Sequence, residues 1–375
     1  MAEHRIAYFI SLDSIHCKKW VNHLSKNNKC IIITYQGMSS IDVDLPELKI
    51  YNIFPKKFPV KNFVSRWIAL FRISKILKQN KITLIHSMYC YPNSIWAGYF
   101  KSYKKIITTR GSDVLLDYKS IKNSDNSSLI YLKNKLEQAL RDAVFISSTS
   151  LQQKNYLIEQ GFDAAKISVI RTGIEPEHFS IKQGPPKTEN QFRILSPRSV
   201  QNNYNIHHMF LALKHIISLK PDLNISLDQV LFNLNTNYLQ SLYKLIEDED
   251  LKNHVHFIQP YDLKSVSTIY SGYDVAIMIP QSDGTPVSAL EVMINKKPLI
   301  ISNLPYDNDL INENYCWFVN PNKVNEIAEC ILKIITASEK EISIKTEKAY
   351  ENVLKNANTH NEMQKVLQLY NFVKP

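Results

Sequence analysis

The chain has 375 residues, which exceeds what one ordinary hydrophobic core supports and suits two domains. Hydrophobic residues make up 44% and charged residues 21%, which is typical of a globular protein and excludes a disordered chain. The formal net charge of +10 comes entirely from the first half. Residues 1–180 carry 26 Lys and Arg against 14 Asp and Glu, whereas residues 181–375 carry 19 against 21.

The cysteines and the apolar runs indicate the cellular compartment in which the protein folds. Five cysteines are scattered without a C-x-x-C pair, which indicates a reducing compartment and neither a zinc site nor a disulfide framework. The first apolar run breaks at Asp13 without a small-residue cleavage site, so it predicts a β-strand and not a signal peptide. No run of about 18 apolar residues occurs. We therefore expect a cytoplasmic protein, with peripheral contact at the inner face of the cell membrane as an option.

Strand-like and helix-like segments alternate through the first half. Five short runs rich in β-branched and aromatic residues predict strands, and helical spacing over 15–24 separates the first two. The runs are I-A-Y-F-I-S-L, C-I-I-I-T-Y, L-I-H-S-M, K-I-I-T-T and A-V-F-I-S-S-T. Such alternation favours a parallel sheet covered by helices on both faces.

The same pattern restarts after a polar segment at 181–191 that contains Gly184, Pro185 and Pro186 and has the composition of a linker. Strands are predicted at F-R-I-L-S-P, H-V-H-F-I-Q, D-V-A-I-M-I-P and P-L-I-I-S-N, with helices at 206–219, 238–246 and 287–294. The prediction is an α/β fold of two Rossmann-like domains facing a central cleft. We expect a first domain over 1–180, a second over 181–345, and a C-terminal helix over 346–375 that returns to the first.

The most specific segment runs from Ser282 to Glu291, between a predicted strand and a predicted helix. Helix residues near Val287 and Ser288 present unpaired amides and the positive end of the helix dipole, which suits an anion. Gly284 lets the backbone approach a ligand closely. Asp283 and Glu291 flank the helix start; capping by Asp283 and a solvated Glu291 are the structural alternatives.

This segment resembles the paired-acid region of GT-B glycosyltransferases of family 4, with Asp283 where those enzymes usually carry Glu. The resemblance implies that Asp283 contacts hydroxyls of the donor sugar and that amides around Gly284, Thr285, Val287 and Ser288 contact sugar and phosphate. It implies that Glu291 binds the ribose hydroxyls. Because Asp is one methylene shorter than Glu, the Asp283 carboxylate extends less far toward the sugar than the family's Glu.

Three further segments resemble family motifs in the expected order. They are T-R-G-S-D-V (109–114), similar to H-G-S-D-V; S-V-I-R-T-G-I-E-P-E-H-F (168–179), similar to V-I-P-N-G-V-D-x-x-x-F; and P-R-S-V (197–200), similar to the opening of a phosphate loop. Arg198 in the last of them is the candidate for the donor phosphate, because a guanidinium can fork two phosphate oxygens. A surface Arg paired with a nearby acid is the structural alternative.

The chain departs from the family in that loop. The family's Lys and Gly are absent, and residues 201–205 read Gln-Asn-Asn-Tyr-Asn. With one cation fewer, the donor could carry less phosphate charge, so a CMP-activated nonulosonic acid is an alternative to an ordinary nucleoside diphosphate sugar.

Candidates on the acceptor side lie in the first half. Arg110, at the position of the family's His, and Asp113 follow a predicted strand where an acceptor or reacting sugar would sit. A turn or cap formed by Asp113 is the structural alternative. His16 follows the first strand and could reach the cleft or be structural. Retention by front-face departure of the leaving phosphate requires no general base.

The stretch Lys56–Lys81 holds eight basic residues and no acid, with Phe63, Trp67 and Phe71 among its apolar residues at helical spacing. Such a helix can lie on an anionic membrane, or its apolar stripe can be ordinary core packing with a solvated basic rim. A lipid-linked acceptor would suit the first option. Nucleic acid is not expected as a partner, because no recognised motif for it occurs.

No cofactor and no metal are expected. Asp42-Val43-Asp44 matches a D-x-D metal motif, but this common tripeptide lies among loop residues and is interpreted as solvated. The sequence thus predicts a metal-independent glycosyltransferase that uses a nucleotide-sugar donor and a glycan or lipid-linked acceptor in surface polysaccharide biosynthesis. The alternative is a degenerate scaffold that binds a sugar nucleotide or a partner glycosyltransferase without turnover.

Overall fold

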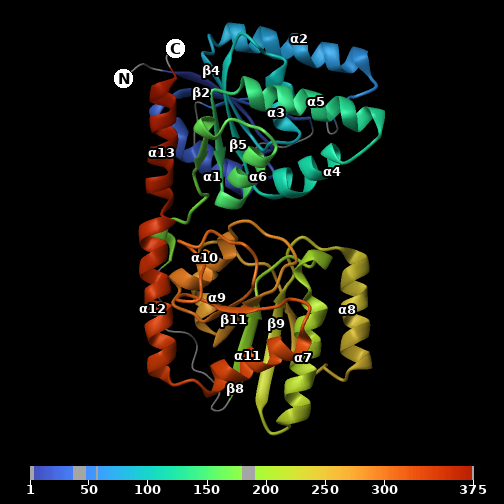
Figure 1. Cartoon of the computed structure of the whole chain (residues 1–375), viewed down its shortest axis with the longest axis vertical. Helices are drawn as coiled ribbons and strands as arrows, with labels where there is room; N and C mark the ends of the chain where they lie inside the picture. Colours follow the sequence, from blue (N-terminus) through green and yellow to red (C-terminus); the bar gives the residue numbers. More distant parts are fainter. Residues whose placement is uncertain (1–3, 37–47, 56–57, 180–190, 374–375) are drawn as a thin grey trace. The chain divides into compact units, whose positions relative to one another are not determined.

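The computed structural model describes residues 4–36, 48–55, 58–179 and 191–373. The chain divides into two compact units (Figure 1): residues 1–172 with 359–375, and residues 173–358. The predicted boundaries were 180/181 and 345/346. The segment after Gly173 groups with the second unit, in which the Ile174 amide donates to the Ala357 carbonyl at 2.9 Å.

The first unit is built on a seven-stranded parallel sheet in the order β3-β2-β1-β4-β5-β6-β7. Its strands are β1 (Arg5–Phe9), β2 (Lys29–Tyr35), β3 (Lys49–Phe54), β4 (Leu84–Met88), β5 (Lys104–Thr109), β6 (Phe145–Ser148) and β7 (Ile167–Val169). Successive residues of β1 alternate between two buried clusters, one on each face of the sheet. The predicted parallel sheet covered on both faces is confirmed.

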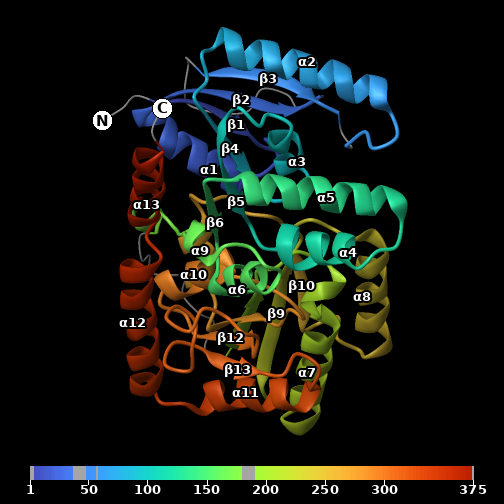
Figure 2. The same ribbon diagram turned by 45° about the horizontal axis from the view of Figure 1, so that its top comes forward.

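Helices cover each face of this sheet. One face carries α2 (Phe63–Gln79), α3 (Asn93–Gly98), α5 (Ser127–Asp142) and α6 (Leu151–Glu159). The other face carries α1 (Ile15–Leu24) and α13 (Thr359–Phe372). A π-helical turn, η2 (Asp113–Tyr118), and α4 (Lys119–Lys122) follow β5. Figure 2 shows α2 beside the edge strand β3.

The second unit repeats the design with a six-stranded parallel sheet in the order β10-β9-β8-β11-β12-β13. Its strands are β8 (Gln191–Ser196), β9 (Asn224–Val230), β10 (Val255–Ile258), β11 (Val275–Met278), β12 (Leu299–Ser302) and β13 (Trp317–Val319). One face carries α7 (Ile206–Leu219), α8 (Thr236–Asp248) and α11 (Val324–Thr336). The other carries α9 (Val266–Ser271), α10 (Val287–Ile294) and α12 (Glu339–Asn356).

The C-terminal stretch was predicted as one helix over 346–375, but it contains two helices, α12 and α13, which pack in different units. The helix α12 packs against α10 in the second unit. In the first unit, the Tyr370 hydroxyl of α13 lies 2.6 Å from His86 Nδ1 of β4, and the Tyr370 carbonyl lies 2.9 Å from His4 Nε2. The helix α13 is thus part of the first unit's core.

The strand orders locate the place where each unit can bind a ligand. In an open parallel sheet, ligands bind outside the carboxyl ends of the strands, where the order of the strands reverses. The reversal falls between β1 and β4 in the first unit and between β8 and β11 in the second. The segments that follow these four strands are therefore the expected ligand-binding segments of the two units.

Candidate functional site

In the second unit, two predicted site residues meet at this reversal point. Arg198 follows β8, and Asp283 follows the neighbouring strand β11. The Arg198 guanidinium donates to Asp283 Oδ2 at 2.7 Å and to Ser288 Oγ of α10 at 2.8 Å. Three residues predicted from two separate motifs thus form one hydrogen-bonded group.

The Arg198–Asp283 pair is withdrawn from solvent. Their side chains are 12% and 18% exposed, so the alternative of a surface Arg does not describe Arg198. Burial acts to lower the pKa of Arg198, but the Asp283 carboxylate and then Tyr204 outweigh it and raise that pKa. The guanidinium therefore stays charged, and much of its charge is balanced within the protein.

The loop over residues 201–205 completes the group. The Tyr204 hydroxyl accepts a hydrogen bond from Arg198 at 2.7 Å, and its ring lies under the guanidinium carbon at 4.3 Å. Asn203 Nδ2 donates to the Ser282 carbonyl at 2.9 Å. Tyr204 was not predicted as a site residue, because no motif gives a signal for it and this loop was distinguished only by its lack of Lys and Gly.

The start of α10 is not capped by a side chain. The cap residue is Pro286, with no side-chain hydrogen bond, and the amides of Ala289 and Leu290 donate to its carbonyl. Asp283 instead accepts from Arg198 and, through Oδ1, from the Gly284 amide at 2.9 Å. The amides of Val287 and Ser288 precede the first intrahelical hydrogen bond, as an anion site requires.

Glu291 lies in the middle of α10 and is half-buried. Burial raises the pKa of Tyr270, and the charges of Tyr261 and Glu291 raise it further. The Glu291 carboxylate therefore lies close to these two tyrosines. Thr285 and Gly284 form the half-buried turn that leads into α10.

In the first unit, Arg110 follows β5. Its guanidinium carbon lies 4.1 Å from the centre of the Trp20 ring, and Nη1 donates to the Thr172 hydroxyl at 3.1 Å. The Arg110 Nε is buried without a hydrogen-bond partner among the described residues. His16, in the first turn of α1, is close enough that burial, together with Arg110 and Lys19, lowers the pKa of His16 to about 4. His16 is therefore neutral at pH 7.

Asp113 is buried, and its carboxylate receives three backbone amides. Oδ1 accepts from Arg110 at 2.9 Å and Gly111 at 2.8 Å, and Oδ2 accepts from Cys90 at 2.5 Å. Burial raises the pKa of Asp113, while these bonds and Arg110 counteract the rise. Asp113 thus ties the loop after β5 to the loop after β4, and Gly111, at φ +129°, makes the turn from β5 into η2.

A cavity of about 520 Å³ lies at the carboxyl edge of the first sheet, where β1 and β4 end. Asp13, Asp113 and Asp117 line it, together with the hydroxyls of Tyr89 and Tyr91. Within the described part of the chain, no Lys, Arg or His belongs to its lining. Asp117, in the π-helical turn η2, and Tyr91, in the segment after β4, were not predicted because both lie outside any motif.

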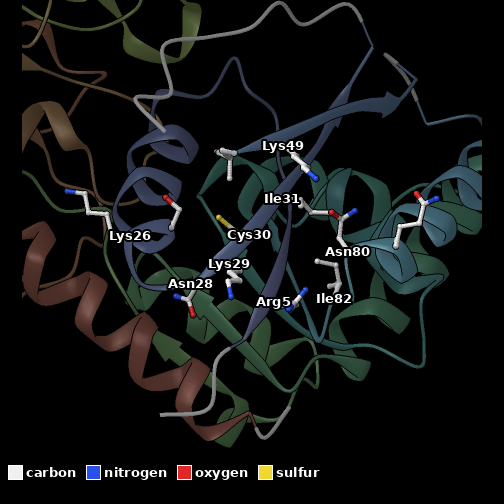
Figure 3. A pocket seen from close by; sticks show the side chains of 12 residues that line it. Arg5, Lys26, Asn28, Lys29, Cys30, Ile31, Lys49, Asn80 and Ile82 are labelled. Atoms are coloured by element: carbon white, nitrogen blue, oxygen red, sulfur yellow. The ribbon is translucent and has the colours of Figure 1, made fainter. Parts of the chain in front are cut away.

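A second cavity, of about 710 Å³, lies at the opposite, amino edge of the same sheet (Figure 3). Among the described residues, its lining includes Arg5, Lys26, Lys29 and Lys49 and no acidic residue. Figure 3 shows Lys26 and Lys49 on opposite sides of it, so their charges do not converge. Because ligands of such sheets bind at the carboxyl edge, this cavity is not the candidate site.

The basic stretch forms α2, and its apolar residues divide between two faces. Ala69, Ile73, Ile76 and Leu77 are buried against the sheet. The other face exposes large apolar side chains, and we call it the exposed α2 face. It consists of Phe63 at 62%, Val64 at 67%, Trp67 at 61%, Ile68 at 55% and Phe71 at 63% exposure. Core packing within the described chain therefore does not account for these five residues.

The described residues contain neither a membrane-spanning helix nor a cluster of metal-binding side chains. None of the described helices combines the length and apolarity needed to cross a bilayer. The described His, Cys, Asp and Glu side chains form no cluster of three or more that could hold a metal ion. Asp42 and Asp44 lie outside the described residues.

Two family models match the chain, one in each half. The model "Glycosyl transferases group 1" matches residues 178–357, and "Glycosyl transferase 4-like" matches residues 5–150. Among curated proteins, the O-antigen chain mannosyltransferase RfbU of Salmonella typhimurium is 23% identical over 194 residues, which are 52% of this chain and 51% of the relative. The matches span about half or less of the length of the curated relatives.

Solved structures match over the whole length. A glycosyltransferase from Rickettsia africae has a TM-score of 0.80 at 18% identity and covers 100% of this chain and 99% of its own. The Anabaena protein HepE in complex with UDP-glucose has a TM-score of 0.75 at 12% identity, with 98% and 99% covered. The chain therefore has the GT-B glycosyltransferase fold. Together with the two family matches, this identifies it as a protein that resembles glycosyltransferases of family 4.

Proposed function

We propose that the protein is a glycosyltransferase that moves a sugar from a nucleotide-sugar donor to a glycan or lipid-linked acceptor with retention of configuration. The observation that carries the proposal is the group formed by Arg198, Asp283 and Ser288 at the start of α10. A cation, a carboxylate and the unpaired amides of a helix start suit a ligand that joins a phosphate to a sugar. Anabaena HepE, which shares the fold, is described in complex with UDP-glucose.

The donor-side roles follow from charge. Arg198 and the amides of Val287 and Ser288 hold the phosphate and stabilise the negative charge that grows on it as it leaves. Asp283 accepts from a hydroxyl of the donor sugar, and Glu291 accepts from the ribose hydroxyls, as the family resemblance implies. These roles need no metal ion and no cofactor.

The reaction exchanges one bond at the anomeric carbon. The bond from that carbon to the phosphate oxygen breaks, and the acceptor oxygen bonds to the same face of the sugar. The acceptor's proton passes to the departing phosphate oxygen, so the protein supplies no base. On the acceptor side, in the first unit, His16 is neutral at pH 7 and offers polar contacts, and Arg110 supplies a positive charge.

We further propose that the exposed α2 face lies on an anionic membrane. Its five apolar side chains are accompanied on the same helix by Arg66, Arg72, Lys75 and Lys78. Apolar residues can enter the interface while cations attract anionic headgroups. This contact would bring a lipid-linked acceptor to the first unit, as surface polysaccharide biosynthesis requires, and would keep the protein at the inner face of the cell membrane.

A CMP-activated nonulosonic acid remains the second candidate donor, favoured by one observation. Arg198 is the only Lys or Arg between residues 196 and 205, and Asp283 already balances much of its charge. A single phosphate needs fewer cations than a diphosphate.

The test is a thermal-shift screen of UDP, GDP, CMP and their sugars, followed by transfer assays with the nucleotide that binds. We expect one nucleotide class to raise the melting temperature, and its sugar to release nucleotide when an acceptor is present. Glu291→Ala should weaken binding of that nucleotide. If no donor releases nucleotide although one binds, the protein is an inert sugar-nucleotide scaffold and the transferase proposal is wrong.

A further inference from the structure

The hydroxyl of Tyr306 is a buried polar group that the site described above does not use. Its oxygen is withdrawn from solvent, and it has no hydrogen-bond partner among the described residues. Buried hydroxyls are nearly always paired, because leaving one unpaired costs free energy. An unpaired hydroxyl beside a candidate site is therefore a group that a bound ligand can pair.

Tyr306 lies next to the donor-side group. It follows β12, whose neighbour in the sheet is β11, the strand that leads to Asp283. The ends of the two strands are joined by a 2.7 Å hydrogen bond from Ser302 Oγ to the Pro280 carbonyl. The Tyr306 ring packs against the cluster that contains Met278 of β11 and Leu290 of α10.

The Tyr306 hydroxyl lies close enough to Asp283 and Arg198 for both charges to affect its pKa. Burial raises the pKa of Tyr306; the Asp283 carboxylate raises it further, and Arg198 lowers it. The phenol is therefore protonated at neutral pH and has one proton to donate. Asp283 does not take that proton, because the Tyr306 hydroxyl has no hydrogen-bond partner among the described residues.

We propose that Tyr306 is a donor-binding residue whose hydroxyl donates a hydrogen bond to the phosphate of the nucleotide sugar. This inference rests on the proposed function. Arg198 attracts the phosphate to this place, and it is the only Lys or Arg in the loop after β8. The remaining phosphate oxygens therefore need neutral donors. Tyr306 supplies one without adding charge, and its unpaired proton becomes paired when the donor binds.

The substitution Tyr306→Phe tests this, because it removes only the hydroxyl. Without a nucleotide, the variant should melt at the same temperature as the wild type or higher, since an unpaired buried hydroxyl is gone. The affinity for the nucleotide that binds the wild type should fall about ten- to a hundredfold, the size expected for a hydrogen bond to a charged group. A purely structural tyrosine would not give these two opposite effects.

The probes are UDP, GDP or CMP, whichever binds the wild type, each with and without its sugar, measured by calorimetry. Tyr243→Phe, a half-exposed tyrosine on α8, is the matched control and should change neither property. An unchanged affinity of Tyr306→Phe, or a loss seen only with the sugar-bearing form, overturns the phosphate contact. If the wild type binds no nucleotide at all, the proposed function itself fails, and this inference fails with it.

Discussion

Arg198 is held by three side chains before any ligand is considered. Asp283, Ser288 and Tyr204 each accept one of its hydrogen bonds, at 2.7 to 2.8 Å. A long, flexible side chain is thereby kept in one direction, which lowers the entropy lost when it grips a phosphate. The planar guanidinium presents its donors in fixed directions, whereas the three donors of a Lys ammonium rotate.

Substitution of Arg198 should separate binding from stability. Arg198→Ala is expected to abolish the rise in melting temperature caused by the nucleotide, and to lower the free energy of unfolding by about 1–3 kcal/mol because Asp283 loses its partner. Arg198→Lys should keep part of the nucleotide effect, since it keeps the charge. Thermal-shift titration with the nucleotide measures both effects.

Arg193 on β8 offers a matched control. It is also paired with a carboxylate, Asp228 at 3.1 Å, and lies over an aromatic ring, that of Tyr273. Arg193→Ala should lower stability but leave the nucleotide effect intact. Full nucleotide protection in Arg198→Ala would refute the assignment of Arg198 to the phosphate.

Residue by residue, the sequence predicted those members of the donor-side group that belong to motifs. Arg198, Asp283 and Ser288 lie directly after strands or at a helix start, where local order alone implies a role. Tyr204 and Tyr306 were not predicted. Tyr204 lies in a short 3-10 turn (Asn202–Tyr204) and Tyr306 on a loop. Their proximity to the group depends on which strands are neighbours, which no local pattern reveals.

At the scale of elements, α2 carries the clearest prediction. Replacing Phe63, Trp67 and Phe71 by Ser should weaken binding to vesicles that contain phosphatidylglycerol, because apolar area that enters the interface is lost. Stability should hardly change, since all three side chains are more than 60% exposed. High salt should also release the wild type, as each basic residue near the surface contributes on the order of 1 kcal/mol. Vesicle co-sedimentation measures both effects.

Leu219→Ser is the control for this experiment, because Leu219 is 59% exposed at the end of α7 in the second unit. Its vesicle binding should equal that of the wild type. Binding that is indifferent both to salt and to the triple substitution would count against the membrane contact.

Elements differed in how well the sequence predicted them. Strands such as β11 and β12 are continuous apolar runs and were predicted. The strand β9 was missed because Asp228 and Gln229 interrupt its apolar pattern, although both are buried. Hydrogen bonds inside the protein hold both residues: Tyr273 donates to Asp228 at 2.6 Å, and Gln229 Nε2 donates to the Arg198 carbonyl at 2.7 Å. Only tertiary contacts make such a strand stable.

At the scale of the whole molecule, the first unit is closed by the end of the chain. One face of its sheet is covered by α1 and α13 alone among the described helices, and Met363, Val366 and Tyr370 of α13 are buried there. Ending the chain at Asn358 should therefore expose this face and prevent the first unit from folding, seen as loss of soluble protein and of its unfolding transition.

A milder change keeps that prediction testable if the truncated chain is insoluble. Tyr370→Phe leaves Nδ1 of the buried His86 without its 2.6 Å partner and should cost about 1–3 kcal/mol in denaturant unfolding. Phe372→Ser, at a position 75% exposed on the same helix, should cost much less. Equal effects of the two substitutions would show that α13 does not stabilise the unit through this contact.

The sequence by itself determined the fold class, the repetition of two parallel α/β domains, and the segment from Ser282 to Glu291 as the donor-side candidate. These follow from the period of apolar residues and from short motifs, which are local properties of the chain. The tertiary structure alone decided three things: that Arg198 pairs with Asp283, that Tyr306 lies beside them, and that five apolar residues of α2 face outward. Each depends on the order of strands in a sheet and on which helix face packs against it. Residues far apart in the chain meet there, and their contacts follow from burial in three dimensions.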